Sequence, residues 1–204
     1  MEWLHAQEFD LSRLQRIKQP KPLGGSHRIK LRSRPMANLI ELFDNPSSVR
    51  DWQPINDRVM GGVSSSQMRF DPAGHAVLAG VVSLLNNGGF ASVRAQLLRL
   101  GGPGTTAYCI TAWGDGNTYK LNLRTASGFD ELSYQASFTP ATGQWSQTEL
   151  PLAKFLPTFH GRVLPDVPPL QPTLVTQLGL MISDRQAGPF RLLLKSIEAV
   201  GADA

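Results

Sequence analysis

The clearest structural signal in this chain is the stretch Tyr119-Lys-Leu-Asn-Leu-Arg124, in which apolar and polar residues alternate. Successive side chains of a β-strand point to opposite faces, so the pattern predicts a strand with Tyr119, Leu121 and Leu123 on a buried face. The other three residues then lie on a face that water can reach. The same alternation recurs from Tyr134 to Phe138. Two half-buried strands are therefore predicted in the middle of the chain.

Short apolar runs separated by glycine, asparagine and proline continue this pattern on both sides. The runs are Leu39–Phe43, His75–Leu85, Phe90–Leu98, Ala107–Trp113, Leu178–Ile182 and Phe190–Ile197. No stretch after residue 36 has a sustained helical period, and Leu164–Pro172 is so rich in proline that it predicts a surface loop. About nine or ten strands at this spacing indicate an all-β protein, an antiparallel β-sandwich or jelly roll.

Charge divides the chain into two parts. The 204 residues hold 20 Lys and Arg against 16 Asp and Glu, but residues 1–35 carry a net charge of +5 and residues 36–204 a net charge of −1. From Gln19 to Pro35 the composition is proline, glycine and basic residues, after two weak helical turns between Glu8 and Ile17. We therefore expect a flexible, basic N-terminal arm (1–35) followed by one domain (36–204). Met36 offers an alternative start.

The cysteine count, the apolar runs and the N-terminal sequence indicate the cellular compartment of the protein. A single cysteine, Cys109, excludes an internal disulfide and is expected to be a buried, inert thiol in a strand. No apolar run approaches the ~20 residues of a membrane-spanning helix. The N-terminus has no signal-peptide pattern, and Glu2, Glu8 and Asp10 disfavour a transit peptide. These features predict a cytoplasmic protein, with a mitochondrial location as the alternative if the source is eukaryotic.

Catalytic constellations are missing from the sequence. The four histidines have no second His, Cys or acid at a metal-ligand spacing, and the glycine clusters match no phosphate-binding loop. The 12 basic residues after position 35 are scattered singly, which disfavours specific nucleic-acid binding. We therefore predict no catalytic residue, no bound metal and no cofactor.

Four segments place polar residues among glycines. They are Asn56–Ser64, Asn86–Arg94, Gly114–Tyr119 and Gly179–Asp184. Such segments form tight turns that side-chain hydrogen bonds hold, and Asp57 is expected to pair with Arg58 or Arg94 in a buried, charge-assisted contact. Two interpretations remain open: the segments support turns, or they also line a binding surface.

In this order, the segments resemble the complex I intermediate-associated protein 30 family. The resemblance rests on Asn-Asp-Arg-Val-Met-Gly-Gly-Val-Ser (56–64), Asn-Asn-Gly-Gly-Phe-Ala-Ser-Val-Arg (86–94) and Gly-Asp-Gly-Asn-Thr-Tyr (114–119). Further matches are Phe159-His-Gly-Arg162 and Leu178–Phe190, so the resemblance covers about residues 38–200. Asn117 is a departure, because many relatives have arginine there.

The resemblance implies a galactose-binding-like β-sandwich and a non-enzymatic role. Its mitochondrial relatives assist assembly of respiratory NADH:ubiquinone oxidoreductase (complex I), so the expected partner is a protein client, a complex I subunit or assembly intermediate. A module that binds carbohydrate or another small ligand is the alternative. The residues expected in the binding surface or its supporting shell are Asp57, Arg58, Asn86, Asn87, Arg94, Asp115, Tyr119 and Asp184.

Overall fold

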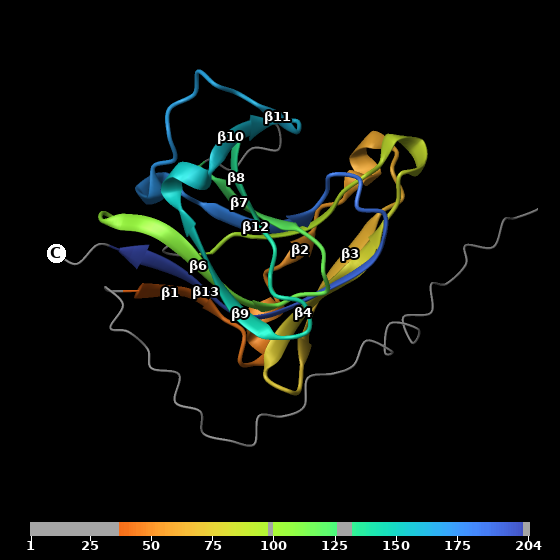
Figure 1. The fold of residues 1–204 in the computed structure, drawn as a ribbon, viewed down its shortest axis with the longest axis horizontal. Helices are drawn as coiled ribbons and strands as arrows, with labels where there is room; N and C mark the ends of the chain where they lie inside the picture. Colours follow the sequence, from red (N-terminus) through yellow and green to blue (C-terminus); the bar gives the residue numbers. More distant parts are fainter. Residues whose placement is uncertain (1–36, 98–99, 126–131, 202–204) are drawn as a thin grey trace, which may run out of the picture.

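A computed structural model describes residues 37–97, 100–125 and 132–201 of the chain. Within these ranges the backbone forms two antiparallel sheets that lie one on the other, which is the predicted β-sandwich (Figure 1). The predicted arm, its two helical turns and the boundary at residue 36 lie outside the described residues.

The first sheet, sheet A, has six strands. They are β1 (Ala37–Leu42), β3 (Ser65–Asp71), β4 (His75–Val82), β6 (Thr105–Trp113), β9 (Trp145–Pro151) and β13 (Gly188–Gly201). The order is β3-β4-β13-β6-β9. Because β13 has 14 residues, β4 pairs with its first half and β1 with its second half. The last strand of the chain therefore fastens the first described strand to the sheet.

The second sheet, sheet B, has seven strands. They are β2 (Gln53–Pro54), β5 (Ala91–Ala95), β7 (Tyr119–Arg124), β8 (Ser133–Phe138), β10 (Leu156–Phe159), β11 (Arg162–Val163) and β12 (Gln177–Ile182). The order is β11-β10-β8-β7-β12-β5-β2. Short 3-10 helices lie in the connections: η2 (Pro46–Val49), η3 (Asp57–Met60), η4 (Leu85–Asn87), η5 (Leu152–Lys154) and η6 (Pro172–Leu174).

The core lies between the two sheets, and the predicted alternation places its residues there. Tyr119, Leu121 and Leu123 of β7 are completely buried, and they belong to the same apolar cluster as Leu192 and Leu194 of β13. Each such side chain contributes about 1.5–3 kcal/mol when it leaves water. Burial of one face of each sheet therefore stabilises the sandwich and fixes the register of its strands.

The apolar runs identified most of the strands but missed the polar ones. The described residues form thirteen strands rather than nine or ten. Among those missed are β3 and β9, whose sequences Ser-Ser-Gln-Met-Arg-Phe-Asp and Trp-Ser-Gln-Thr-Glu-Leu-Pro carry few apolar residues. Both are edge strands of sheet A, so one face and one edge of each meet water. The predicted loop at 164–172 has no strand, although Leu170 within it is buried in the core.

Candidate functional site

The four glycine-rich segments meet at one end of the sandwich. Val82 pairs with Gly188, while Ile182 pairs with both Ala91 and Tyr119. The connections 83–90, 114–118 and 183–187 therefore leave the sheets from the same end. Figure 1 shows η3 and η4 beside each other there, in orange and yellow-green. The predicted residues are brought together, with the exception of Arg94 in the middle of β5.

Asp57 is the hub of this end. Its side chain is completely buried, and its two carboxylate oxygens accept hydrogen bonds from the Ser64 backbone N–H (3.0 Å), the Ser64 hydroxyl (2.5 Å) and the Gly89 N–H (2.8 Å). A longer contact of 3.4 Å comes from the Phe90 N–H. Burial by itself raises the pKa of Asp57, but these hydrogen bonds outweigh it and lower the pKa below its ordinary value. Asp57 thus joins the 56–64 segment to the 86–90 segment as a carboxylate.

Two glycines make room for this carboxylate. A Cβ atom on Gly62 would lie 2.3 Å from the Asp57 Cγ atom, and a Cβ atom on Gly88 would lie 2.6 Å from Asp57 Oδ2. Real Cβ atoms do not approach other atoms so closely, so any side chain at these positions displaces Asp57. The buried acid therefore explains Gly62 and Gly88, whereas Gly61 and Gly89 have positive φ angles of 86° and 146°.

The predicted pairing of Asp57 with an arginine is wrong. Arg58 is exposed to solvent, and Arg94 lies on β5, where it pairs with Gln53 and Gly179. Backbone N–H groups and one hydroxyl satisfy Asp57 instead. A buried carboxylate with several such donors needs no cationic partner.

Asp115 holds a second junction. Its Oδ2 accepts hydrogen bonds from the Tyr119 hydroxyl (2.9 Å) and from the Arg191 backbone N–H (2.7 Å), and its Oδ1 accepts one from the Asn117 N–H (2.9 Å). Burial, followed by the charge of Asp115, raises the pKa of Tyr119 well above its ordinary value. The Gly-Asp-Gly-Asn-Thr-Tyr segment thus connects sheet B, through Tyr119, to β13 of sheet A.

Gln186 is a residue of this end that the sequence analysis did not select. Its amide oxygen accepts a hydrogen bond from the Thr118 N–H (2.9 Å), and its amide nitrogen donates to the Thr118 carbonyl (2.8 Å) and the Ser183 carbonyl (2.9 Å). It therefore ties the 183–187 connection to the 114–118 connection. The only signal for it in the sequence is its place in the family-like Leu178–Phe190 segment.

The remaining residues of this end are exposed. Asn86 and Asn87 have positive φ angles of 54° and 59°, a conformation that asparagine tolerates better than most residues. Asp184 forms an ion pair of 2.7 Å with the Lys120 ammonium group. Together with Arg58, these side chains form the solvent-facing part of the predicted set.

Arg94 belongs to a different surface, the outer face of sheet B, which is turned away from sheet A. We define this face by Ser92, Arg94, Lys120, Asn122, Arg124, Gln135, Ser137, Gln177, Gly179 and Met181. The register places Arg94, Gly179, Asn122 and Gln135 in one row across β5, β12, β7 and β8. Burial, followed by the charge of Arg124, lowers the pKa of Arg94, so the two guanidinium groups influence each other across this face.

Several polar side chains of the outer face are deeply buried. Arg124 is 5 % exposed and Gln177 is 9 % exposed, and the two residues pair directly across β7 and β12. The Gln177 Oε1 and Asn122 Oδ1 atoms have no hydrogen-bond partner among the described residues. The alternation of 119–124 predicted the side that Lys120, Asn122 and Arg124 face, but not their burial.

The sequence comparison identifies the group of proteins to which these motifs belong. The sequence profile of the complex I intermediate-associated protein 30 family matches residues 42–194. The chain belongs to this family. The match includes all four glycine-rich segments and every strand of sheet B.

Two relatives illustrate how far the likeness extends. The mitochondrial complex I intermediate-associated protein 30 of Drosophila melanogaster is 25 % identical over 183 residues, which cover 79 % of this chain and 61 % of that protein. An uncharacterized protein of Schizosaccharomyces pombe is 36 % identical over 73 residues, covering 34 % of this chain and 33 % of that protein. The chain thus spans about three fifths of the length of the Drosophila relative.

The fold of this family member is also similar to a solved carbohydrate-binding module. The family 11 module of a Clostridium thermocellum cellulosomal cellulase superimposes with a TM-score of 0.63 and 14 % identity, covering 84 % of this chain and 98 % of that module. At this identity the likeness concerns the fold alone. It confirms the predicted antiparallel β-sandwich of the jelly-roll kind.

The described residues contain neither a cluster of metal ligands nor a membrane-spanning helix. No group of three or more His, Cys, Asp or Glu residues that could hold a metal ion lies in residues 37–97, 100–125 and 132–201. No helix in the described part of the chain is long and apolar enough to cross a membrane. Cys109 is completely buried, as predicted, and His160 is exposed.

Proposed function

We propose that this chain is a non-enzymatic, protein-binding assembly factor whose client is a subunit or assembly intermediate of respiratory complex I. The observation that carries the proposal is the family match over residues 42–194. It is supported by the name of the Drosophila relative, which is a complex I intermediate-associated protein. In a eukaryote this role places the chain in the mitochondrion, as in that relative, and in a bacterium it places the chain in the cytoplasm.

We propose the outer face of sheet B as the surface that contacts the client. Arg94, Lys120 and Arg124 give it positive charge, and Asp184 forms an ion pair with Lys120 at its rim. Unsatisfied buried polar atoms such as Gln177 Oε1 and Asn122 Oδ1 cost free energy, which a rearrangement of these side chains on client binding would relieve. This chemistry suits a client segment that presents carboxylates together with backbone N–H and C=O groups.

The glycine-rich end supports that surface in this proposal. Asp57 and Asp115 hold the connections from which β5 and β7 begin, and Gln186 holds the connection in which β12 ends. Arg58, Asn86, Asn87 and Asp184 project from the same connections into solvent and extend the contact area. The predicted set thus divides into a buried shell and an exposed rim.

The carbohydrate-binding alternative has only the fold likeness in its favour. Sugar rings pack well on aromatic side chains, but the strand positions of the outer face of sheet B are occupied by polar, basic and aliphatic residues. Tyr119 and Tyr134 point into the core instead. A panel of soluble oligosaccharides that leaves the melting temperature unchanged argues against this alternative.

Affinity purification from the source organism tests the proposal. The tagged full chain is expected to recover complex I subunits or an assembly intermediate from gently solubilised membranes, and Arg94→Glu is expected to reduce that recovery at least tenfold. Arg50→Glu is the matched control, because Arg50 is an exposed arginine in the connection between β1 and β2. Recovery of no complex I protein by the unaltered chain contradicts the assembly role. Equal loss with Arg94→Glu and Arg50→Glu contradicts the choice of surface.

A further inference from the structure

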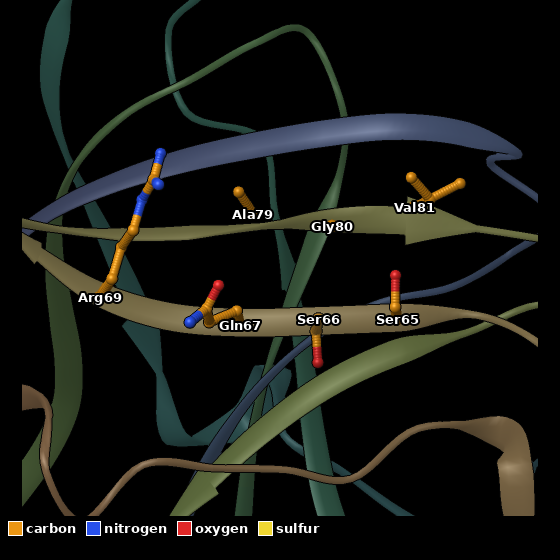
Figure 2. Close-up of a pocket in the computed structure, with 7 residues that line it drawn as sticks. All are labelled: Ser65, Ser66, Gln67, Arg69, Ala79, Gly80 and Val81. Carbon is orange, nitrogen blue, oxygen red and sulfur yellow. The ribbon is translucent and has the colours of Figure 1, made fainter. Parts of the chain in front are cut away.

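A pocket lies on the outer face of sheet A, on the opposite side of the sandwich from the surface proposed for the client. It has a volume of about 430 Å³ between β3 and β4 (Figure 2). Its walls are formed by Ser65, Ser66, Gln67, Arg69, Ala79, Gly80 and Val81. The family-like segments at the end of the sandwich do not line this pocket. The first of them ends at Ser64, immediately before the lining residue Ser65.

Small residues of both strands leave this pocket open: Ala79 lies opposite Gln67, and Ser65 lies opposite Val81. Figure 2 shows Ser65, Gln67 and Arg69 on the same side of the hairpin as Ala79 and Val81. Gln67 pairs with Ala79, whose methyl group leaves the space above the strand open. Gly80 is required beside it, because a Cβ atom there would lie 2.0 Å from the Ser65 carbonyl oxygen. The small residues therefore keep two strands close and the surface above them hollow.

Arg191 borders this pocket from the next strand. It pairs with Ala79 across β13 and β4, so its side chain leaves the same face of the sheet directly beside the pocket. Side chains of directly opposed residues begin about 5 Å apart. Arg191 is only 6 % exposed, yet its Nε has no hydrogen-bond partner among the described residues. A buried guanidinium nitrogen without a partner is costly, and it points to a missing acceptor.

The charges around Arg191 have an excess of positive sign. Burial, followed by the charge of Arg69, lowers the pKa of Arg191, so the two guanidinium groups lie close enough to repel each other. Asp71 opposes this effect, but it also lies 3.9 Å from His75 Nε2. Within the described ranges, no ion pair joins Arg69 or Arg191 to an acid. An anion between the two arginines would remove the repulsion and supply the missing acceptor.

We propose that this pocket binds the anionic group of a small organic molecule, a carboxylate or a phosphate ester, between Arg69 and Arg191. Planar guanidinium groups suit both anions because they donate two parallel hydrogen bonds. The Ser65 hydroxyl and the Gln67 amide are neutral donors on the same wall, and Ala79 with Val81 offers an apolar floor to the carbon part of the ligand. The site is independent of the client surface, so either proposal can fail without the other.

Titration of the full chain with three probes tests the site. Glycerol 3-phosphate, succinate and inorganic phosphate are added to the ¹⁵N-labelled protein at low ionic strength, where competition from salt is weakest. We expect saturable shifts of the β3 and β4 amide signals with a Kd of about 1 mM or tighter for at least one organic probe. Binding of glycerol 3-phosphate indicates a phosphate ester, and binding of succinate indicates a carboxylate. No saturable shift with either of them overturns the proposal.

Three variants separate the site from general charge effects. Arg69→Gln removes an exposed guanidinium and is expected to weaken binding about tenfold or more. Ala79→Leu fills the pocket and is expected to abolish binding while both arginines remain. Arg162→Gln removes an exposed arginine at the edge of sheet B and is expected to leave the Kd unchanged. Unchanged binding in both pocket variants overturns the assignment, provided that their far-ultraviolet circular dichroism matches the unaltered chain.

Discussion

The Oδ2 atom of Asp57 accepts a hydrogen bond of 2.8 Å from the backbone N–H of Gly89, across a separation of 32 residues. The same oxygen accepts the Ser64 hydroxyl at 2.5 Å. The Asp57 side chain thus links the connection that precedes β3 to the connection that precedes β5. The two glycine motifs thus form a single structural unit, in which Gly62 and Gly88 leave room for Asp57: a Cβ atom at either position would lie 2.3 Å or 2.6 Å from an Asp57 atom.

Replacement of Asp57 by alanine is expected to destabilise the protein by about 3 kcal/mol or more. The change leaves the buried N–H of Ser64 and the partly buried N–H of Gly89 without an acceptor. Urea denaturation at neutral pH measures the free energy of unfolding. Asp184→Ala is the control, since it removes an exposed acid whose ion pair with Lys120 contributes at most about 1 kcal/mol. Similar losses in the two variants would contradict the role of Asp57 as a hub.

Gly62→Ala tests the close contact with Asp57. The added Cβ would lie 2.3 Å from the Asp57 Cγ, so the carboxylate must move and its hydrogen bonds must lengthen. We expect a loss of about 2 kcal/mol or more in the free energy of unfolding. Gly102→Ala is the matched control, because nothing lies within 4 Å of its added Cβ and its φ angle is not in the left-handed region. The control is expected to stay within about 0.5 kcal/mol of the unaltered chain, and an equal effect at both positions would refute the steric argument.

Tyr119→Phe removes the hydroxyl that donates to Asp115 at 2.9 Å. A hydrogen bond to a charged acceptor contributes about 1.5–3 kcal/mol, so a loss in this range is expected. A double-mutant cycle with Asp115→Ala measures the coupling of the two side chains. A coupling free energy near zero would show that the hydrogen bond from the Arg191 backbone N–H to Asp115 stabilises the protein independently of Tyr119.

The raised pKa of Glu41 is expected to make the free energy of unfolding depend on pH. Burial raises the pKa of Glu41 from 4.5 to about 7 in the folded chain. Because the folded state prefers the protonated form, this contribution to stability is complete below about pH 4.5 and is lost as the pH rises through 7. Glu41→Gln keeps a neutral side chain of similar shape. It is therefore expected to be more stable than the unaltered chain by roughly 2 kcal/mol at pH 8, and about equal to it at pH 4.5.

Chemical denaturation of both chains at the two pH values gives this difference directly. Burial also lowers the pKa of His75, so folding disfavours its protonation and stability falls as the pH drops below the ordinary value of 6.5. That effect is common to both chains and cancels in the comparison. A difference between the chains that does not change with pH would disprove the assignment to Glu41.

Deletion of residues 1–35 is expected to leave both folding and client recovery intact. These residues carry a net charge of +5, whereas the family match begins at residue 42. The melting temperature and the affinity purification described above measure the two properties. Loss of either one would move the domain boundary toward the N-terminus.

Much of the fold could be predicted from the pattern of residue types along the chain, whereas only part of the candidate site could. Alternation identified β7 and β8 and the faces on which Leu121 and Lys120 lie. It missed β3 because the hydrogen bonds of this strand to β4, rather than apolar side chains, hold it at the edge of the sheet. The motifs identified Asp57 and Asp115, but the partners of Asp57 differ from those expected: N–H and hydroxyl donors took the place of an arginine.

The sequence by itself determined the two-residue period, the all-β class and the family, since these depend on the order of residue types along the chain. Only the tertiary structure decided which groups donate to the buried Asp57, and that Asn86 and Asn87 are exposed. It also decided that Arg191 stands beside Ala79 at the pocket between β3 and β4. The physical reason is distance along the chain: burial, charge coupling and unsatisfied donors arise from groups that strand pairing brings together from positions tens of residues apart.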